Sequence, residues 1–415
     1  MPETLSCDVA VIGAGIVGLG IAWEAQRSGR TVTIIDPAPA SGATFAAAGM
    51  LAAVSELHYQ EERLLGLTLA SAALWPDFAA PFAAAGPVEG AAGPADPGFR
   101  TTATLVAGAD AADRRALAEL RTLQLAHGLD VEQLSIREAR TREPMLGAAL
   151  SGVFSVAADH RVDPRALATA IRAQLTAGAV GQGRLRDEDT GIRRRATGLL
   201  HENQADTSSR VIGAVLDDGR TVRARETVVA NGLGAPALEG LPAGLRLPMR
   251  PVFGDILRLR VPAHLDPLVS STIRGLVHGV PVYIVPRDDG TVVIGATQRE
   301  DGTAAVSAGG VYRLLRDAQV LVPAVAELEL LESTARARPG TPDNAPLLGR
   351  VAGPDGVDIP GLILATGFFR HGVLLTPVAA QTCRELMNGI TDLSLLPFRP
   401  DRFSTGPADP AKEDV

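Results

Sequence analysis

Cysteine is almost absent from this chain of 415 residues, which has only two. Cys7 and Cys383 lie far apart in the sequence, so we expect no structural disulfide. A metal site built on a pair of cysteines is excluded for the same reason. So few thiols fit a reducing compartment, and we expect a cytoplasmic protein.

Positive charge is also scarce, because 39 Lys and Arg stand against 47 Asp and Glu, for a net charge of −8. This balance argues against a nucleic-acid partner, and no basic run is interleaved with aromatic residues. The run Arg193–Arg195 lies among acids and predicts a solvated loop. The apolar run Val9–Trp23 is too short and too rich in glycine to cross a membrane, and no export segment is expected.

Familiar catalytic constellations are missing too. The seven histidines show no metal-ligand spacing, so no metal site is predicted, and no Ser/His/Asp or paired-carboxylate arrangement stands out. An apolar content of 46% is typical of a globular protein. The length exceeds what one core usually supports, so two domains are expected.

What the sequence does contain is a strand, a glycine turn, a helix and a second strand at its start. Gly13 allows a tight turn, Gly15 allows close approach to a pyrophosphate, and Gly18 allows the helix over about 16–28 to pack on the sheet. The helix N-terminus attracts phosphates. Asp36, after the second strand, can accept hydrogen bonds from both ribose hydroxyls, which favours NAD or FAD over NADP.

A run of small residues, Pro37–Leu51, follows the acid directly. Such a run can be a flexible linker, or it can let the backbone approach a cofactor closely. The residues by themselves leave both interpretations open.

Hydrophobic spacing and turn residues predict the remaining elements. Loops are expected at 81–98, 181–210 and 366–375, and residues beyond 405 are expected to be disordered. The expected helices span 61–82, 110–127, 163–176, 308–321 and 376–387; the expected strands lie within 99–107, 211–216, 221–224, 226–230, 248–261, 280–296, 328–335 and 361–365.

This order predicts an α/β protein in which a Rossmann-like cofactor domain is interrupted by an α+β substrate domain with an antiparallel sheet. The cofactor domain is assigned to residues 1–85, 160–245 and 339–405. The substrate domain is assigned to 86–159 and 246–338, and 406–415 form a disordered tail.

Four motifs then carry a family resemblance: Val11–Gly18, Ala46–Leu51, Val282–Arg287 with Gly295–Thr297, and Ala337–Asp343 with Gly367–Leu375. Together they resemble the D-amino-acid oxidase family of flavoproteins, most closely the FAD-dependent glycine oxidases of thiamine (thiazole) biosynthesis. The first motif is generic to dinucleotide folds, whereas the other three are specific. The resemblance covers nearly the whole chain and favours the flavin for the small-residue run.

The resemblance implies FAD contacts at positions that match the family. FAD should be bound non-covalently, because Arg336 stands where some relatives carry a flavin-linked cysteine. His371 is expected to contact the flavin through its backbone. The implied contacts are Gly13, Gly15, Ile16, Val17 and Gly18; Asp36 and Pro37; Ala43, Thr44, Ala48, Gly49 and Met50; Ala196 on the adenine side; and Phe368, Phe369, Arg370, His371, Gly372, Val373 and Leu374.

For the substrate, the resemblance implies Arg338 as the carboxylate-binding arginine, with Tyr283 and Arg370 as companions. Arginine suits this role because its fork of N–H donors binds a carboxylate bidentately. On the residues alone, Arg338 could cap a turn, Tyr283 could be core, and Arg370 could act only through its backbone. No catalytic residue is expected, since the flavin carries the chemistry.

Three positions depart from the family pattern. Gln298 stands at the expected rim of the site, and Pro281 and Val282 replace polar or thiol residues ahead of Tyr283. A changed rim would alter the preferred amine. The fold is not affected by these differences.

The implied activity is oxidative deamination of glycine, sarcosine or small D-amino acids, with hydride transfer to FAD and reduction of O2 to H2O2. The imine would supply thiazole synthesis, with a possible hand-off to thiazole synthase, and the family suggests a homotetramer. One alternative is a D-amino-acid or sarcosine dehydrogenase that passes electrons to a carrier other than O2. Another is a non-catalytic flavin-holding subunit.

Overall fold

The structure is a computed structural model that describes residues 4–83, 96–182 and 191–404. The predicted tail at 406–415 and most of the predicted loop at 81–98 lie outside these residues. The chain divides into two compact units. The first unit comprises 1–41, 171–250 and 339–415, and the second comprises 42–170 and 251–338.

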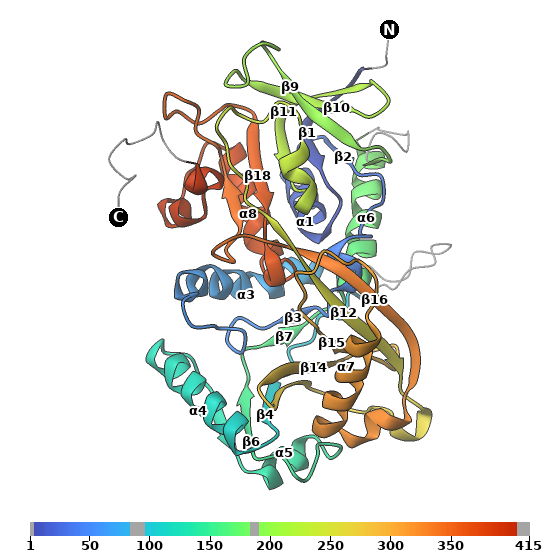
Figure 1. Cartoon of the computed structure of the whole chain (residues 1–415). Coiled ribbons are helices and arrows are strands. Elements are labelled where there is room, and N and C mark those ends of the chain that lie inside the picture. The colour runs from blue at the N-terminus through green and yellow to red at the C-terminus, as the bar shows by residue number, and fades with distance from the viewer. Residues whose placement is uncertain (1–3, 84–95, 183–190, 405–415) are drawn as a thin grey trace. The chain divides into compact units, whose positions relative to one another are not determined.

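The first unit contains an eight-stranded sheet in which β17, β18, β11, β1, β2 and β8 follow one another, with β10 and β9 continuing from β11. Figure 1 shows β1, β11 and β18 side by side although they come from distant parts of the sequence. The parallel strands are β1 (Thr4–Ile12), β2 (Val32–Ile35), β8 (Gly191–Ile192), β11 (Thr221–Val229) and β18 (Leu362–Thr366). The antiparallel strands are β9 (Ala196–His201), β10 (Val211–Leu216) and β17 (Leu347–Gly349).

Helices cover this parallel sheet, as its sequence requires. All residues of β2 and β18 are buried, and strands buried on both faces read as continuous apolar runs. Helix α1 (Ile16–Arg27) packs against β1 and β2 and against α8 (Thr376–Met387). The Nε1–H of Trp23 in α1 donates to Oε1 of Gln174 at 2.9 Å, in the part of α6 (Pro164–Gly181) that belongs to this unit.

Both cysteines belong to the first unit and are free thiols, so the prediction of no disulfide is confirmed. Cys7 lies in β1 and is half-buried. Cys383 lies in α8 and is completely buried, and this burial raises the pKa of its thiol to about 12.

The second unit contains another eight-stranded sheet, in the order β16, β12, β15, β14, β13, β4, β6 and β5. Strands β4 and β13 are parallel, whereas β12, β15, β14 and β13 form an antiparallel series. The strands are β4 (Thr104–Gly108), β5 (Glu132–Leu134), β6 (Gly152–Val156), β12 (Arg250–Arg260), β13 (Thr272–Val277), β14 (Val280–Pro286), β15 (Thr291–Gly295) and β16 (Glu329–Gly340).

Helices and a small ribbon complete the second unit. Helix α7 buries Leu314, Ala318 and Leu321 in the core beside β13, β14 and β15. A separate two-stranded sheet pairs Met50 with Arg161. The elements are α2 (Ala43–Ala46), β3 (Met50–Leu51), α3 (Glu62–Ala83), α4 (Ala111–Ala126), α5 (Ile136–Arg142), β7 (His160–Arg161) and α7 (Ala308–Leu321).

The predicted fold class is confirmed: a parallel, helix-covered sheet alternates along the chain with a mainly antiparallel one. Several details were wrong. The loop predicted at 181–210 contains β8 and β9, and the strand predicted from 99 begins at Thr104. Strands β3, β5, β6, β7 and β13 and helix α5 were not expected. Residues 42–85 and 160–170, assigned to the cofactor domain, belong to the second compact unit, so their cofactor role stays a prediction.

A buried carboxylate supports the segment that follows Met50. Asp159 has no exposed surface, and its oxygens accept hydrogen bonds from the N–H groups of Val54 at 3.0 Å and Ser55 at 3.1 Å. Burial raises its pKa from 3.8 to about 6, against the opposing effects of these hydrogen bonds and of the positive charge of Arg274.

This shift predicts a pH-dependent stability. Because the folded-state pKa lies above the unfolded value, the stabilisation is present below about pH 4 and is lost as the pH rises through about 6. We expect the free energy of unfolding of the natural protein, relative to Asp159→Asn, to fall by about 3 kcal/mol over that range. Denaturant unfolding at several pH values measures it, with the exposed Asp130→Asn as control. A difference that does not change with pH contradicts the assignment.

Candidate functional site

The sequence-predicted cofactor residues of the first unit gather at one edge of its sheet. The strands β1, β2, β11 and β18 are parallel, so their carboxyl ends meet at the same edge. The glycine turn follows β1, Asp36 follows β2, and the loop 367–375 follows β18. Ligands of open parallel sheets bind at this edge.

The glycine turn fits tightly against the end of β11. Gly13 has a φ of +107°, and a Cβ there would lie 2.6 Å from the carbonyl oxygen of Ala230. A Cβ on Gly18 would lie 2.1 Å from the carbonyl oxygen of Gly13. Helix α1 begins immediately after this turn, with Gly15 as its N-cap and no side chain capping it. The N-terminus of a helix favours an anion such as a pyrophosphate.

Asp36 connects the glycine turn to the start of the small-residue run through its two carboxylate oxygens. Its Oδ2 accepts the N–H of Ala14 at 2.6 Å, and its Oδ1 accepts the N–H of Ala38 at 2.8 Å. A carboxylate has about four lone-pair sites, so it can also accept ribose hydroxyls. Backbone N–H donors and one carboxylate acceptor together form a polar set that fits a dinucleotide.

The loop after β18 has an unusual backbone. Phe369 has a φ of +47°, which is uncommon for a residue other than glycine, and such conformations cluster at functional sites. Thr366 and Thr376 anchor its two ends, because their hydroxyls donate to the carbonyl oxygens of Gly232 at 3.1 Å and Gly372 at 2.8 Å. In this loop His371 is buried and Arg370 is half-buried.

Ala196 does not follow one of the parallel strands whose carboxyl ends form this edge of the sheet. It begins β9, an antiparallel strand that pairs with β10. The strand beside β2 is β8, and the carbonyl oxygen of Ile192 accepts the N–H of Asp36 at 3.0 Å. The end of β8 thus lies closer in the sheet to Asp36, the predicted ribose-binding acid, than Ala196 does.

In the second unit, the predicted flavin segment Ala48–Met50 is held by a buried arginine. Arg287 donates from Nη2 to the carbonyl oxygen of Ala48 and from Nη1 to that of Val162 at 2.9 Å. Gly49 lies between these groups with a φ of +74°, and a Cβ on it would be 2.0 Å from the Val162 oxygen. Only glycine fits there.

The charge of Arg287 is almost completely removed from water. Its side chain is 3% exposed, and its Nε lies 3.5 Å from Oδ2 of Asp163. Burial lowers its pKa to about 10, while Asp163 opposes the shift. The guanidinium therefore remains charged at neutral pH, and its contacts rigidly define the backbone path at Ala48.

The flavin segment and the predicted substrate strand share one small core. Ala46, Ala48, Ile256, Val285 and Val293 form a buried cluster, against which Met50, Tyr283 and Ala296 pack. Thr44 is also buried in α2, two residues before Ala46, and Ala43 begins that helix. Residues predicted to contact the cofactor and Tyr283, predicted to contact the substrate, thus pack together within the second unit.

Arg338 and Tyr283 approach one another across two intervening strands. In the sheet order β16, β12, β15, β14, Arg338 comes from β16 and Tyr283 from β14. Arg338 lies over Gly254 of β12 and donates a long hydrogen bond of 3.5 Å to the carbonyl oxygen of Thr297. Tyr283 lies over its register partner Gly295 in β15.

Burial raises the pKa of Tyr283 to about 12, although the positive charge of Arg338 opposes this. The phenol is therefore protonated at neutral pH and can donate a hydrogen bond. A guanidinium and a neutral phenol together form a donor set that fits a small carboxylate. The substrate role of the two residues stays a prediction.

The three positions that depart from the family pattern lie in different surroundings. Val282 is 3% exposed and lies in the main core of the second unit. Successive side chains of a strand point to opposite faces, so Val282 faces away from Tyr283 whereas Pro281 shares its face. Pro281 and Gln298 are both exposed.

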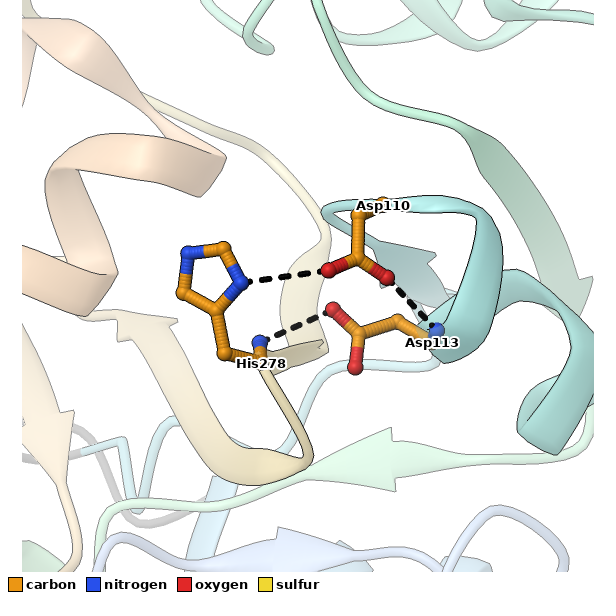
Figure 2. A group of neighbouring side chains, drawn as sticks. All are labelled: Asp110, Asp113 and His278. Atoms are coloured by element: carbon orange, nitrogen blue, oxygen red, sulfur yellow. Dashed lines mark hydrogen bonds and ion pairs between the residues drawn. The ribbon is translucent and has the colours of Figure 1, made fainter.

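A group of two carboxylates and a histidine, shown in Figure 2, resembles a metal site but has another role. Asp110 caps α4 by accepting the N–H groups of Ala112 and Asp113, and it contacts Nδ1 of His278 at 3.1 Å. Asp113 accepts the N–H groups of His278 and Gly279. These hydrogen bonds attach the β13–β14 turn to α4, so no ion is needed to explain the group.

Comparison with known proteins agrees with this geometry. A family model described as FAD dependent oxidoreductase (DAO) matches residues 8–386. Glycine oxidase of Geobacillus kaustophilus is 33% identical over 94% of this chain and 96% of its own length. The chain belongs to the DAO family of FAD-dependent oxidoreductases.

Within the family, the similarity extends to proteins of several names. A bifunctional ThiO/ThiG protein of Nostoc sp. is 28% identical over 92% of this chain. The match covers 52% of the length of that relative. The crystal structure of the Geobacillus kaustophilus glycine oxidase matches with a TM-score of 0.79 and 29% identity, over 96% of this chain and 99% of that one. Iminodiacetate oxidase from Chelativorans sp. BNC1 matches with a TM-score of 0.76 and 25% identity, over 94% of this chain and 98% of that one.

In the described part of the chain, no helix has both the length and the apolar character needed to span a membrane.

Sequence reasoning overlooked two kinds of site residue. Arg287 is the last residue of the motif Val282–Arg287, but no functional role was predicted for it, because a charged residue after an apolar strand usually lies at the surface. Gly254 interrupts an otherwise bulky strand, and a glycine inside a strand often marks a close approach by another group. That signal could have pointed to the position beneath Arg338.

The geometry of Asp36 predicts a loss of FAD affinity on substitution. Asp36→Ala removes both the ribose acceptor and the partner of the Ala14 N–H, so we expect FAD to bind at least about tenfold more weakly. Asp36→Asn retains one acceptor oxygen and should be intermediate. Titration of apoprotein with FAD measures the affinity, and Asp217→Ala, an exposed aspartate of the same unit, is the control. Unchanged affinity in Asp36→Ala would exclude the ribose contact.

Proposed function

We propose that the chain is an FAD-dependent oxidase of glycine and similarly small amines such as sarcosine and small D-amino acids. The observation that carries the proposal is the convergence of Arg338 and Tyr283 within the body that also holds the segment Ala48–Met50. The similarity to proteins named glycine oxidase supports glycine as the first substrate to test.

In this proposal Arg338 binds the substrate carboxylate through two N–H donors, and Tyr283 donates a third hydrogen bond from its protonated hydroxyl. These contacts orient the Cα–H of the amine. Arg370 is proposed as a further substrate contact. FAD, when bound, supplies the hydride acceptor, so the chain itself needs to provide orientation and a dry site rather than an acid or base.

The proposed net reaction converts glycine, O2 and water into glyoxylate, ammonia and H2O2. The imine formed first would either hydrolyse or pass to a thiazole-forming enzyme. Relatives named as bifunctional ThiO/ThiG proteins support such a link. We further propose a homotetramer, which light scattering of the purified protein tests directly.

FAD is proposed to be non-covalent and to contact the residues at the carboxyl edge of the first unit's sheet, the loop 368–374 and the segment 43–50. On the adenine side, we now favour the backbone at the end of β8 over Ala196. The hydrogen bond between Asp36 and Ile192 supports this change.

The substrate class is tested by mixing the yellow holoprotein with excess glycine without oxygen and following the flavin absorbance. We expect bleaching within seconds, reversed by air with release of H2O2. Bleaching by sarcosine or D-alanine alone would show that one of these amines, rather than glycine, is the substrate. Pro281 and Gln298 would then be the first residues to examine for the cause of that preference. Slow reoxidation by air combined with fast dye reduction would replace the oxidase with a dehydrogenase.

The carboxylate contact predicts a selective effect of Arg338→Ala. Loss of a buried charged contact typically costs about 2–5 kcal/mol, so the KM for glycine should rise by about two orders of magnitude or more. FAD content should stay unchanged. Arg260→Ala, an exposed arginine on β12, is the matched control. An unaltered KM in Arg338→Ala would remove this residue from the substrate site.

A further inference from the structure

The two glycines beneath Arg338 and Tyr283 occupy matching places in the sheet. Gly254 lies in β12, next to the strand that carries Arg338, and Gly295 lies in β15, next to the strand that carries Tyr283. Strands β12 and β15 are themselves neighbours, with Ile256 opposite Gly295. Each functional side chain therefore crosses one adjacent strand, and it does so at a glycine.

At Gly254 the arginine fills the space that a side chain would occupy. A Cβ there would lie 2.5 Å from Nη2, 2.6 Å from Nη1 and 2.8 Å from Cζ of Arg338. Carbon atoms do not approach this closely, so the guanidinium would have to move. Arginine is flexible, so the displacement would disturb the position of Arg338 far more than the stability of the fold.

The tyrosine has the same relation to Gly295. A Cβ at this position would lie 2.3 Å from Oη and 2.5 Å from Cζ of Tyr283, and 2.6 Å from Cδ1 of Ile256. The phenol would again have to leave its place. Both donor groups thus reach their positions because the strands beneath them have no side chain at those points.

We propose that Gly254 and Gly295 are positioning residues that set where the carboxylate-binding donors lie, and hence how small an amine must be to react. The inference rests on the proposed function. The two glycines act through Arg338 and Tyr283 and do not themselves need to touch the substrate.

A neighbouring network fixes the carbonyl group to which Arg338 donates. Asp255 has no exposed surface and accepts the hydroxyl of Thr297 at 2.9 Å and Nη2 of Arg299 at 3.0 Å. Its own N–H donates to the hydroxyl of Thr297 at 2.7 Å. The Thr297 carbonyl is therefore held in place, and Gly254 limits the guanidinium from the other side.

The test is a double-mutant cycle on kcat/KM for glycine, which remains measurable when saturation is lost. Gly254→Ala should lower kcat/KM at least about tenfold, mainly through KM. In an Arg338→Ala background the same change should have less than about a twofold effect, because the side chain through which Gly254 acts is missing. Equal effects in both backgrounds would overturn the proposal.

Two controls separate this effect from a general effect of adding a methyl group. Gly66 in α3 and Gly309 in α7 belong to the same unit, and no atom lies within 4 Å of a Cβ built on either. Gly66→Ala and Gly309→Ala should leave kcat/KM unchanged. A tenfold loss in these variants as well would overturn the positional explanation.

A binding measurement gives a readout independent of turnover. Acetate, a carboxylate without an amine, should perturb the flavin spectrum of the oxidised holoprotein, and its dissociation constant should rise in Gly254→Ala as much as KM does. FAD affinity and the thermal midpoint should change little. Acetate binding that is unchanged in Gly254→Ala overturns the proposal.

Gly295→Ala provides a second, separate variant if Gly254→Ala does not fold. It should weaken acetate binding and lower kcat/KM for glycine, and wild-type values in a folded Gly295→Ala protein would refute the proposal for this position. If Arg338→Ala itself has no effect, the proposed function fails. If Arg338→Ala is impaired but both glycine variants behave like the controls, only the present inference fails.

Discussion

Close backbone approach, made possible by glycine, is the constraint on which both units depend. In the first unit, Gly13 allows the turn after β1 to lie against the carbonyl group of Ala230. In the second, Gly49 allows the predicted flavin segment to lie against Val162. Any side chain at either position would separate two segments that are also held by hydrogen bonds. The positions of the functional groups therefore depend on the absence of a side chain at these glycines as much as on the contacts that are made.

The second unit combines this close packing with an uncommon electrostatic feature. Burying a guanidinium is costly unless hydrogen bonds and an opposite charge compensate for it. Arg287 meets two backbone carbonyl groups and the carboxylate of Asp163, so its charge is compensated within one local cluster. Because these partners come from segments far apart in the sequence, the arginine defines their mutual position. Tyr283 lies four residues before Arg287, in the strand β14 that ends at Pro286 directly before the arginine. The residue predicted to bind the substrate and the arginine that holds the predicted cofactor segment are thus close in the chain.

Local sequence patterns predicted the elements whose signals are local. The glycine turn, the helix predicted over 110–127 and the start of α8 at Thr376 and Pro377 were all predicted from neighbouring residues. Strand β9 could not, because the adjacent run Arg193–Arg195 suggested a long polar loop. Long-range pairing, which no local pattern encodes, places β8 beside β2.

The candidate site shows the same division. Family motifs identified Arg338 and Tyr283, and the sheet order explains how residues from β16 and β14 can meet. The sequence could not distinguish Pro281 from Val282 as a rim residue, since that requires knowing which strand face is buried. Nor could it reveal Gly254, whose importance depends on a side chain more than eighty positions away in the chain.

The state of the two cysteines has a consequence for a protein proposed to release peroxide. Thiolates, rather than thiols, are the form that peroxide oxidises. Cys383 in α8 is completely buried, and burial raises the pKa of its thiol to about 12, so the thiol stays protonated. Cys7 is the only other cysteine, and the whole chain has only five methionines. The chain thus has few sulfur atoms that peroxide, if it is the product as proposed, could oxidise, which would favour activity over many turnovers.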